Sequence, residues 1–94
     1  MDPIRFIWDD RKEAVNRRKH GVSFDEARSV FLDENAKLID DPDHSRTESR
    51  FLLPGVSYKL RLLVVSHNYR RNDEEIRIIS ARKAHAHERK AYLE

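Results

Sequence analysis

The sequence predicts an α+β domain with a small, mainly antiparallel sheet, two N-terminal helices and one C-terminal helix. Its length of 94 residues is that of a single domain, spanning residues 1–94. Hydrophobic patterns follow the order strand, helix, helix, several strands, helix. Short turns join the later strands, which makes neighbours antiparallel, and helices at the two ends favour packing on one sheet.

The first two elements are a strand over residues 4–8 and a helix over residues 10–20. Apolar side chains alternate along the strand. Asp10 and Glu13 have the spacing of a capping box at the helix start. Gly21 is placed to end this helix in the left-handed conformation.

A second helix is expected to begin at Ser23 and to stop near Asp33. Ser23 and Glu26 form another capping-box spacing. Apolar residues recur at helical spacing and predict a stripe that faces the core. This stripe consists of Phe24, Ala27, Val30 and Phe31.

The remainder is mainly strand, with a polar loop over residues 41–47. Residues 60–69 give the strongest strand pattern, because a run that is apolar on both faces is typical of a central strand. Asn72 and Asp73 indicate a tight turn. The other expected elements are short strands over residues 36–40, 51–53 (ending at Pro54-Gly55) and 75–81, and a closing helix over residues 82–94.

Composition excludes several classes of protein. The chain has no cysteine, hence no disulfide frame, thiol nucleophile or cysteine zinc site. No run approaches 18 apolar residues and the N-terminus does not read as a leader, so we expect a cytoplasmic protein without a membrane segment. Residues 1–48 hold 9 basic and 12 acidic side chains, net −3, whereas residues 49–94 hold 10 and 5, net +5. This excess is typical of a phosphate-binding surface, or of a merely solvated one.

One candidate site combines Arg61, His67, Arg77 and Arg82. Arg61 and His67 share a face of the central strand, and Arg77 lies on the next strand. A histidine that transfers a proton near neutral pH, beside arginines that stabilise phosphate charge, suits phosphoryl transfer on RNA. The alternative is that these arginines pair with nearby glutamates at the rim of the sheet.

The closing helix predicts a second polar group. Its members stand at i, i+3, i+4 and i+7, and they are His85, Glu88, Arg89 and Tyr92. Tyr92 could donate a hydrogen bond, stack on a base, or simply pack the helix on the sheet. Helical residues two apart point about 200° away from each other, so His85 and His87 are not expected to share a metal ion. We expect neither a metal site nor a cofactor.

Beside these patterns, the chain resembles the BrnT toxins of bacterial type II toxin–antitoxin systems. The resemblance covers nearly the whole chain, in order and with the family's spacing. One departure is visible at residues 85–87, where the family often has Thr, Arg and Arg instead of His, Ala and His. The matching stretches are residues 6–9, 16–27, 41–45, 61–65 and 76–84, together with Glu48, Arg50, Phe51, Glu88, Arg89 and Tyr92.

The resemblance implies a RelE-like fold and a ribonuclease that inhibits translation and growth without a metal. It also implies neutralisation by a BrnA-type antitoxin, a DNA-binding protein expected to be ribbon-helix-helix-like. Toxin and antitoxin would form a two-plus-two complex that contacts operator DNA only through the antitoxin. The alternative is a non-catalytic module that binds nucleic acid or antitoxin, such as a degenerate toxin.

These expectations give each candidate residue a role. Arg77 and Arg82 would bind phosphate, with Tyr92 or His87 as the acid, and the resemblance supports Arg77, Arg82 and Tyr92. His67 would be the base, which rests on chemistry and strand geometry alone. The remaining predicted contacts to RNA are Arg61, Lys83, His87, Glu88 and Arg89.

Overall fold

The computed structural model describes residues 4–41, 43 and 49–94, which form three α-helices, a 3₁₀ turn and a five-stranded sheet. This α+β architecture confirms the predicted fold class. The helices are α1 (Asp10–His20), α2 (Phe24–Ser29) and α3 (Ala86–Leu93), and the 3₁₀ turn η1 (Val30–Leu32) continues α2. The strands are β1 (Arg5–Ile7), β2 (Ile39–Asp40), β3 (Phe51–Val56), β4 (Leu62–Arg70) and β5 (Glu75–Lys83).

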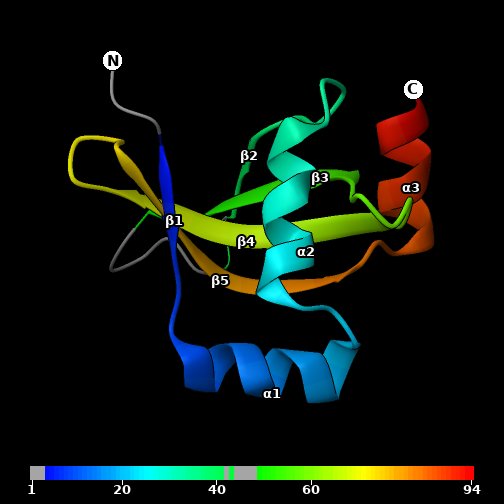
Figure 1. Cartoon of the computed structure of the whole chain (residues 1–94). Helices are drawn as coiled ribbons and strands as arrows, with labels where there is room; N and C mark the ends of the chain where they lie inside the picture. Colours follow the sequence, from blue (N-terminus) through cyan, green and yellow to red (C-terminus); the bar gives the residue numbers. More distant parts are fainter. Residues whose placement is uncertain (1–3, 42, 44–48) are drawn as a thin grey trace.

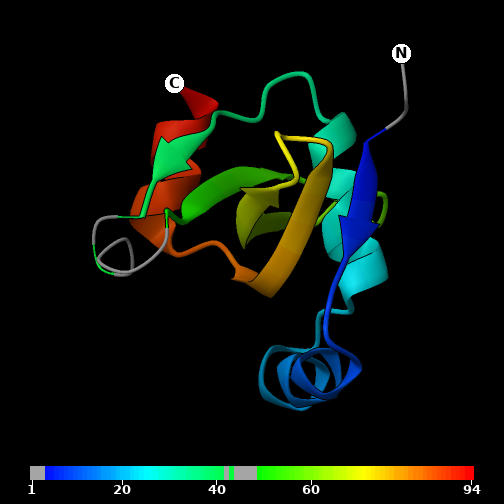
Figure 2. The same cartoon turned by 90° about the vertical axis from the view of Figure 1, so that its left-hand side faces the viewer.

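The strands have the order β1-β5-β4-β3-β2, with β4 at the centre as its apolar run predicts. Only β1 is parallel to its neighbour, β5, so the sheet is mainly antiparallel. Figures 1 and 2 show α2 on one side of the sheet, α3 on the other, and α1 along the edge near β5. None of the helices in the described part of the chain has both the length and the apolar character needed to span a bilayer.

The hydrophobic core lies between α2 and the sheet. The expected stripe of the second helix supplies Phe24, Ala27 and Val30, all with no exposed surface. Successive strand residues alternate between the faces, and the apolar side chains on the α2 side complete this core. They include Leu53, Leu63, Val65, Ile78 and Ala81.

The capping of the first two helices differs from the prediction by one residue at α1. Asp9, rather than Asp10, caps α1 by accepting hydrogen bonds from the backbone of Arg11 (2.8 Å) and Lys12 (3.2 Å). Glu13 accepts a hydrogen bond from the backbone of Phe24 instead of closing a capping box (3.1 Å). Gly21 ends α1 with φ +70°, as expected.

Two strands run further than their sequences indicate. The third strand continues through Pro54, which has no backbone N–H to donate. This is tolerated because β2 pairs only with residues 51 and 52, so no described strand lies beside Pro54 on that edge. Gly55 allows η1 to approach, because a Cβ there would lie 2.8 Å from Cγ1 of Val30. The last strand continues to Lys83, since Arg82 and Lys83 pair with β4, and α3 therefore begins only at Ala86.

Candidate functional site

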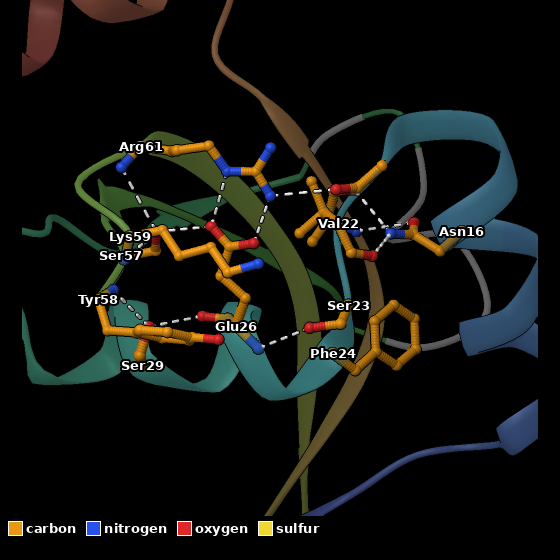
Figure 3. Close-up of polar contacts among 12 residues, drawn as sticks. Asn16, Val22, Ser23, Phe24, Glu26, Ser29, Ser57, Tyr58, Lys59 and Arg61 are labelled. Atoms are coloured by element: carbon orange, nitrogen blue, oxygen red, sulfur yellow. Dashed lines mark hydrogen bonds and ion pairs between the residues drawn. The ribbon is translucent and has the colours of Figure 1, made fainter.

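Arg61 belongs to a hydrogen-bonded network on the α2 side of the sheet (Figure 3). Its guanidinium donates from Nε to Oε2 of Glu26 at 2.9 Å, contacts Oε1 of the same carboxylate, and donates to the carbonyl of Gly21 at 3.0 Å. Ser57 donates a further bond to Oε2 at 2.7 Å. Glu26 has no exposed surface, and the hydrogen bond from Arg61 holds its pKa below the usual range. Arg61 therefore neutralises a buried carboxylate. Its guanidinium is occupied by this contact and is not available for the predicted contact with RNA.

His67 is also part of the core. It shares a face with Arg61, Leu63 and Val65 as strand geometry predicts, but η1 covers that face, and the ring centroid of Phe31 lies 4.8 Å from the imidazole. His67 has no exposed surface, and burial lowers the pKa of its imidazole. The structure therefore does not support the prediction that His67 acts as the base, because the ring has no exposed surface to offer RNA.

The hydrogen bonds of His67 nevertheless fix a second aromatic residue. A carbonyl only accepts, so the 3.2 Å contact with the carbonyl of Val65 places the proton on Nδ1. Nε2 then accepts a hydrogen bond from the hydroxyl of Tyr69 at 3.3 Å. Burial and the nearby charge of Asp73 raise the pKa of Tyr69, which keeps the phenol neutral.

Arg82 meets Glu88 at the junction of β5 and α3, which is the alternative that the sequence left open, and the contact is a bidentate ion pair. Nη1 and Nη2 of Arg82 donate to the two carboxylate oxygens at 2.7 and 2.9 Å. Glu88 also accepts a hydrogen bond from the backbone of His85, the N-cap of α3, at 2.8 Å. The hydrogen bond from Arg82 is the main reason that the pKa of Glu88 falls to about 2. The pair thus joins α3 to the sheet.

Tyr92 holds the other end of α3. Its hydroxyl donates to Oδ2 of Asp33 at 2.5 Å, and this hydrogen bond raises the pKa of Tyr92. Asp33 also accepts bonds from the backbone of Val56 (2.8 Å) and Asn35 (2.9 Å). Of the alternatives for Tyr92, the structure shows the anchoring one, since its proton is committed to Asp33.

Arg77 lies on the opposite side of the sheet from α2. We call this side the open face, although α3 lies over its Val64 and Arg82 end, and it consists of Val64, Ser66 and Asn68 of β4 and Arg77, Ser80 and Arg82 of β5. Arg77 is half-buried and forms no hydrogen bond or ion pair with another described residue. Opposite it, Asn68 is only 5% exposed, and its buried Oδ1 has no hydrogen-bond partner within the described part of the chain.

These two residues line a cavity of about 410 Å³, here called the Arg77 cavity. Polar groups that are buried without a partner are rare in folded proteins and ask for an explanation. An unpaired guanidinium and an unpaired amide carbonyl in one cavity are the features of a site that awaits a polar ligand. The other lining residues are Ser49, Phe51, Tyr69, Arg70 and Asp73.

The four predicted catalytic residues therefore do not form one site. Arg77 and Arg82 share the open face, but their partners Asn68 and Val64 stand four residues apart in β4. At about 3.3 Å per residue this separates them by roughly 13 Å along the strand, too far for both to hold one phosphate. His67 lies on the other face.

The remaining predicted RNA contacts are spread around α3. Lys83, His87 and Arg89 are exposed, and His87 borders a groove between α3 and the sheet together with Glu88 and Tyr92. Glu88 is occupied by Arg82. Among residues 4–41, 43 and 49–94, no three histidine, aspartate or glutamate side chains are grouped so that they could hold a metal ion.

Asn68 and Tyr69 were missed by the sequence reasoning, although a signal for Asn68 was present. Counting outward from the expected turn at Asn72 and Asp73 places residue 77 opposite residue 68, which is the observed register. The sequence could therefore have predicted that a polar side chain of the central strand lies opposite Arg77. The contact between Tyr69 and His67 was not, because it depends on how the rings pack.

The comparisons with known proteins identify the family of the chain. The model of a family described as "Ribonuclease toxin, BrnT, of type II toxin-antitoxin system" matches residues 8–88. The crystal structure of the Brucella abortus ribonuclease toxin BrnT superposes with a TM-score of 0.65 at 25% sequence identity, covering 87% of this chain and 97% of that one. No curated protein matches the chain. The chain belongs to the BrnT family of ribonuclease toxins of type II toxin–antitoxin systems.

Proposed function

We propose that the protein cleaves RNA at the Arg77 cavity without the help of a metal ion. The family supports ribonuclease activity, and one observation supports this place: the guanidinium of Arg77 has no partner among the described residues and lies beside the unsatisfied carbonyl of Asn68. Arginine binds two phosphate oxygens at once, so Arg77 is suited to hold the scissile phosphate and to stabilise the charge that develops on it.

The cavity also supplies groups for proton transfer. In the proposed reaction, the carboxylate of Asp73 takes the proton of the RNA 2′-hydroxyl, whose oxygen attacks phosphorus. The bond from phosphorus to the 5′-oxygen breaks, and the neutral phenol of Tyr69 gives its proton to that oxygen. The products are a 2′,3′-cyclic phosphate and a 5′-hydroxyl. The phenolate of Tyr69 then takes a proton from water and the protonated Asp73 releases its proton to water, which restores both groups.

In this scheme His67 is a positioning residue and does not touch RNA. Its Nε2 accepts a hydrogen bond from the hydroxyl of Tyr69 in the resting protein and so fixes the orientation of the ring. Of the two acids expected from the sequence, Tyr92 is bound to Asp33, and His87 remains an exposed side chain of α3. Tyr69 is preferred over His87 because it lines the cavity that contains Arg77, although its hydroxyl is bound to His67 on the other face and must turn away from that ring to reach the leaving oxygen.

The experiment is cleavage of single-stranded RNA by the purified protein in excess chelator. Tyr69→Phe and Asp73→Asn should each lower the rate about 100-fold or more, the range for loss of a proton-transfer group, while RNA binding is retained. Loss of cleavage in chelator with recovery in added magnesium or manganese would contradict metal independence. A wild-type protein that binds RNA and never cleaves it would instead indicate the degenerate toxin.

A BrnA-type antitoxin is the expected partner, and we propose that it neutralises the toxin in the cytoplasm by covering the open face. Arg77 and the exposed basic side chains of α3 would attract acidic groups of the antitoxin and speed its association. The proposed two-plus-two complex can be checked by its mass in solution. A complex in which the Arg77 cavity stays accessible to a short RNA would contradict this mode of neutralisation.

A further inference from the structure

A second positively charged hollow lies between α1 and β5, on the edge of the sheet. We call it the α1 groove. It has a volume of about 340 Å³, and four of its lining residues are bases: Arg11, Lys12, Lys19 and His20. Among the described residues, none that lines it is acidic. Within the described residues none of these four bases has an ion-pair partner, in contrast to Arg61 and Arg82.

Hydrogen bonds of a buried asparagine fix the position of α1 relative to β5 and so define the groove. Asn16, in the middle of α1, donates from Nδ2 to the carbonyls of Ala81 and Val22, both at 2.9 Å, and accepts from the backbone of Ala81 at 3.0 Å. The side chain thus pairs with the free edge of β5 where β1 has ended. Because Asn16 is buried, α1 is fixed to the sheet and its charged side chains have a defined place.

The groove joins the open face. Its floor is formed by Ile79 and Ser80 of β5, and Ser80 belongs to the open face between Arg77 and Arg82. An RNA strand that leaves the Arg77 cavity along β5 would therefore pass Ser80 and reach the basic side chains of α1. The positive charges of the two sites are thus separated by the uncharged residues Ile79 and Ser80 of one strand.

We propose that the α1 groove binds the sugar–phosphate backbone of the substrate RNA beside the scissile phosphate. The inference rests on the proposed cleavage at the Arg77 cavity and extends it to flanking nucleotides. The groove is suited to bind the phosphates of an RNA strand, since basic side chains without ion-pair partners line it. Val15 is its one exposed apolar side chain. A protein partner such as an acidic antitoxin segment usually needs larger apolar or aromatic anchors.

The test compares two double variants that each lose two positive charges from α1. Lys12→Gln with Lys19→Gln alters the groove, because residues seven apart lie on the same side of a helix. Arg17→Gln with Arg18→Gln is the matched control, since both residues are exposed on α1 but do not line the groove. Binding of long single-stranded RNA, with a 2′-deoxy sugar that prevents cleavage, is measured as a function of salt.

The groove variant should lower the slope of log affinity against log salt by about 1.4, that is about 0.7 for each of two lost phosphate contacts. The control should leave the slope nearly unchanged. Cleavage of a dinucleotide, which is too short to reach α1, should be unaltered in both. Failure of the proposed cleavage would show as an inactive wild type, while the binding slopes would still test the groove.

Equal changes in the two double variants would overturn the proposal, because they would indicate only the overall charge of the protein. An unchanged slope in the groove variant would overturn it as well. Normal RNA binding with weakened binding of the antitoxin would assign the groove to that partner instead. Thermal melting of both variants serves as the control for folding, and neither should differ from the wild type.

Discussion

The two sides of the sheet each carry an arginine, Arg61 or Arg77, that differs from the other in whether the fold supplies it with a counter-charge. On the α2 side, the buried carboxylate of Glu26 is matched by Arg61 and Ser57. On the open face, the guanidinium of Arg77 and the carbonyl of Asn68 lack partners in the described part of the chain, although both border one cavity. The α2 side therefore satisfies its buried charge within the fold, whereas the polar groups of Arg77 and Asn68 are available to a ligand.

On this difference we base the structural role assigned to Arg61 and the role in RNA cleavage proposed for Arg77. Arg61 and Arg77 are both arginines beside the central strand, and the sequence predicts an RNA contact for each. What distinguishes them is whether the fold already supplies a counter-charge. The same criterion makes Arg82 and Tyr92 anchors of α3, because each is bound to a carboxylate.

The largest effect on stability is expected for Arg61→Ala. It leaves Glu26, whose side chain is 1% exposed, as an uncompensated buried charge, which typically costs about 3–5 kcal/mol. Urea denaturation measures the loss. Adding Glu26→Gln to this variant removes the charge and should restore part of the stability, whereas a loss below about 1 kcal/mol in the single variant would contradict a structural role.

A smaller, pH-dependent loss is expected for Glu88→Gln. The pKa of Glu88 falls from 4.5 to about 2 on folding, so its contribution is present above pH 4.5 and is lost as the pH falls towards 2. The shift corresponds to at most about 3 kcal/mol. The stabilities of wild type and variant, measured by denaturation between pH 2 and 7, should therefore converge at the acidic end.

Arg82→Ala is the partner experiment and should destabilise the protein by a similar amount at neutral pH. If the free energies of unfolding of the wild type and of Glu88→Gln differed by the same amount down to pH 2, the ion pair would not be the source of the difference. An Arg82→Ala protein as stable as the wild type would return Arg82 to the candidates for phosphate binding.

The smallest of these stability losses is expected for Tyr92→Phe. The change removes one hydrogen bond to Asp33, which keeps two backbone donors, so the cost should be about 1 kcal/mol. RNA cleavage should remain within about twofold of the wild-type rate, because an anchor is not a proton donor. Thermal melting and a cleavage assay on the same sample check both points, and a hundredfold loss of rate in a stable protein would reinstate Tyr92 as the acid.

Much of the fold could be predicted because its signals are local. The apolar run of β4 indicated a central strand, and Ser23 and Gly21 indicated helix ends that the structure contains. The boundary between β5 and α3 was misplaced because residues 82–84 have helix-forming side chains, and only pairing with Leu63 and Val64 keeps them in the sheet. That pairing partner lies far away in the sequence.

The site was harder to predict because it depends on which face of the sheet is covered. Strand alternation correctly grouped Arg61 with His67, but it could not show that Phe31 lies over the imidazole. Glu26 was expected to close a capping box. Ser23 does accept from the backbone of Glu26, yet the carboxylate turns to Arg61, 35 residues further along the chain. Such long-range pairing decides which arginines stay free.

The most direct test of this account is Arg77→Ala, with the free energy of unfolding and the kcat/KM for RNA cleavage measured on the same preparation. Since Arg77 has no partner in the described chain to lose, stability should stay within about 0.5 kcal/mol of the wild type. The kcat/KM should fall at least about 100-fold, as for loss of a group that stabilises developing charge, and Arg77→Lys should recover only part of it. A stable variant that cleaves RNA at the wild-type rate would contradict the claim that the unpaired open face is the active one.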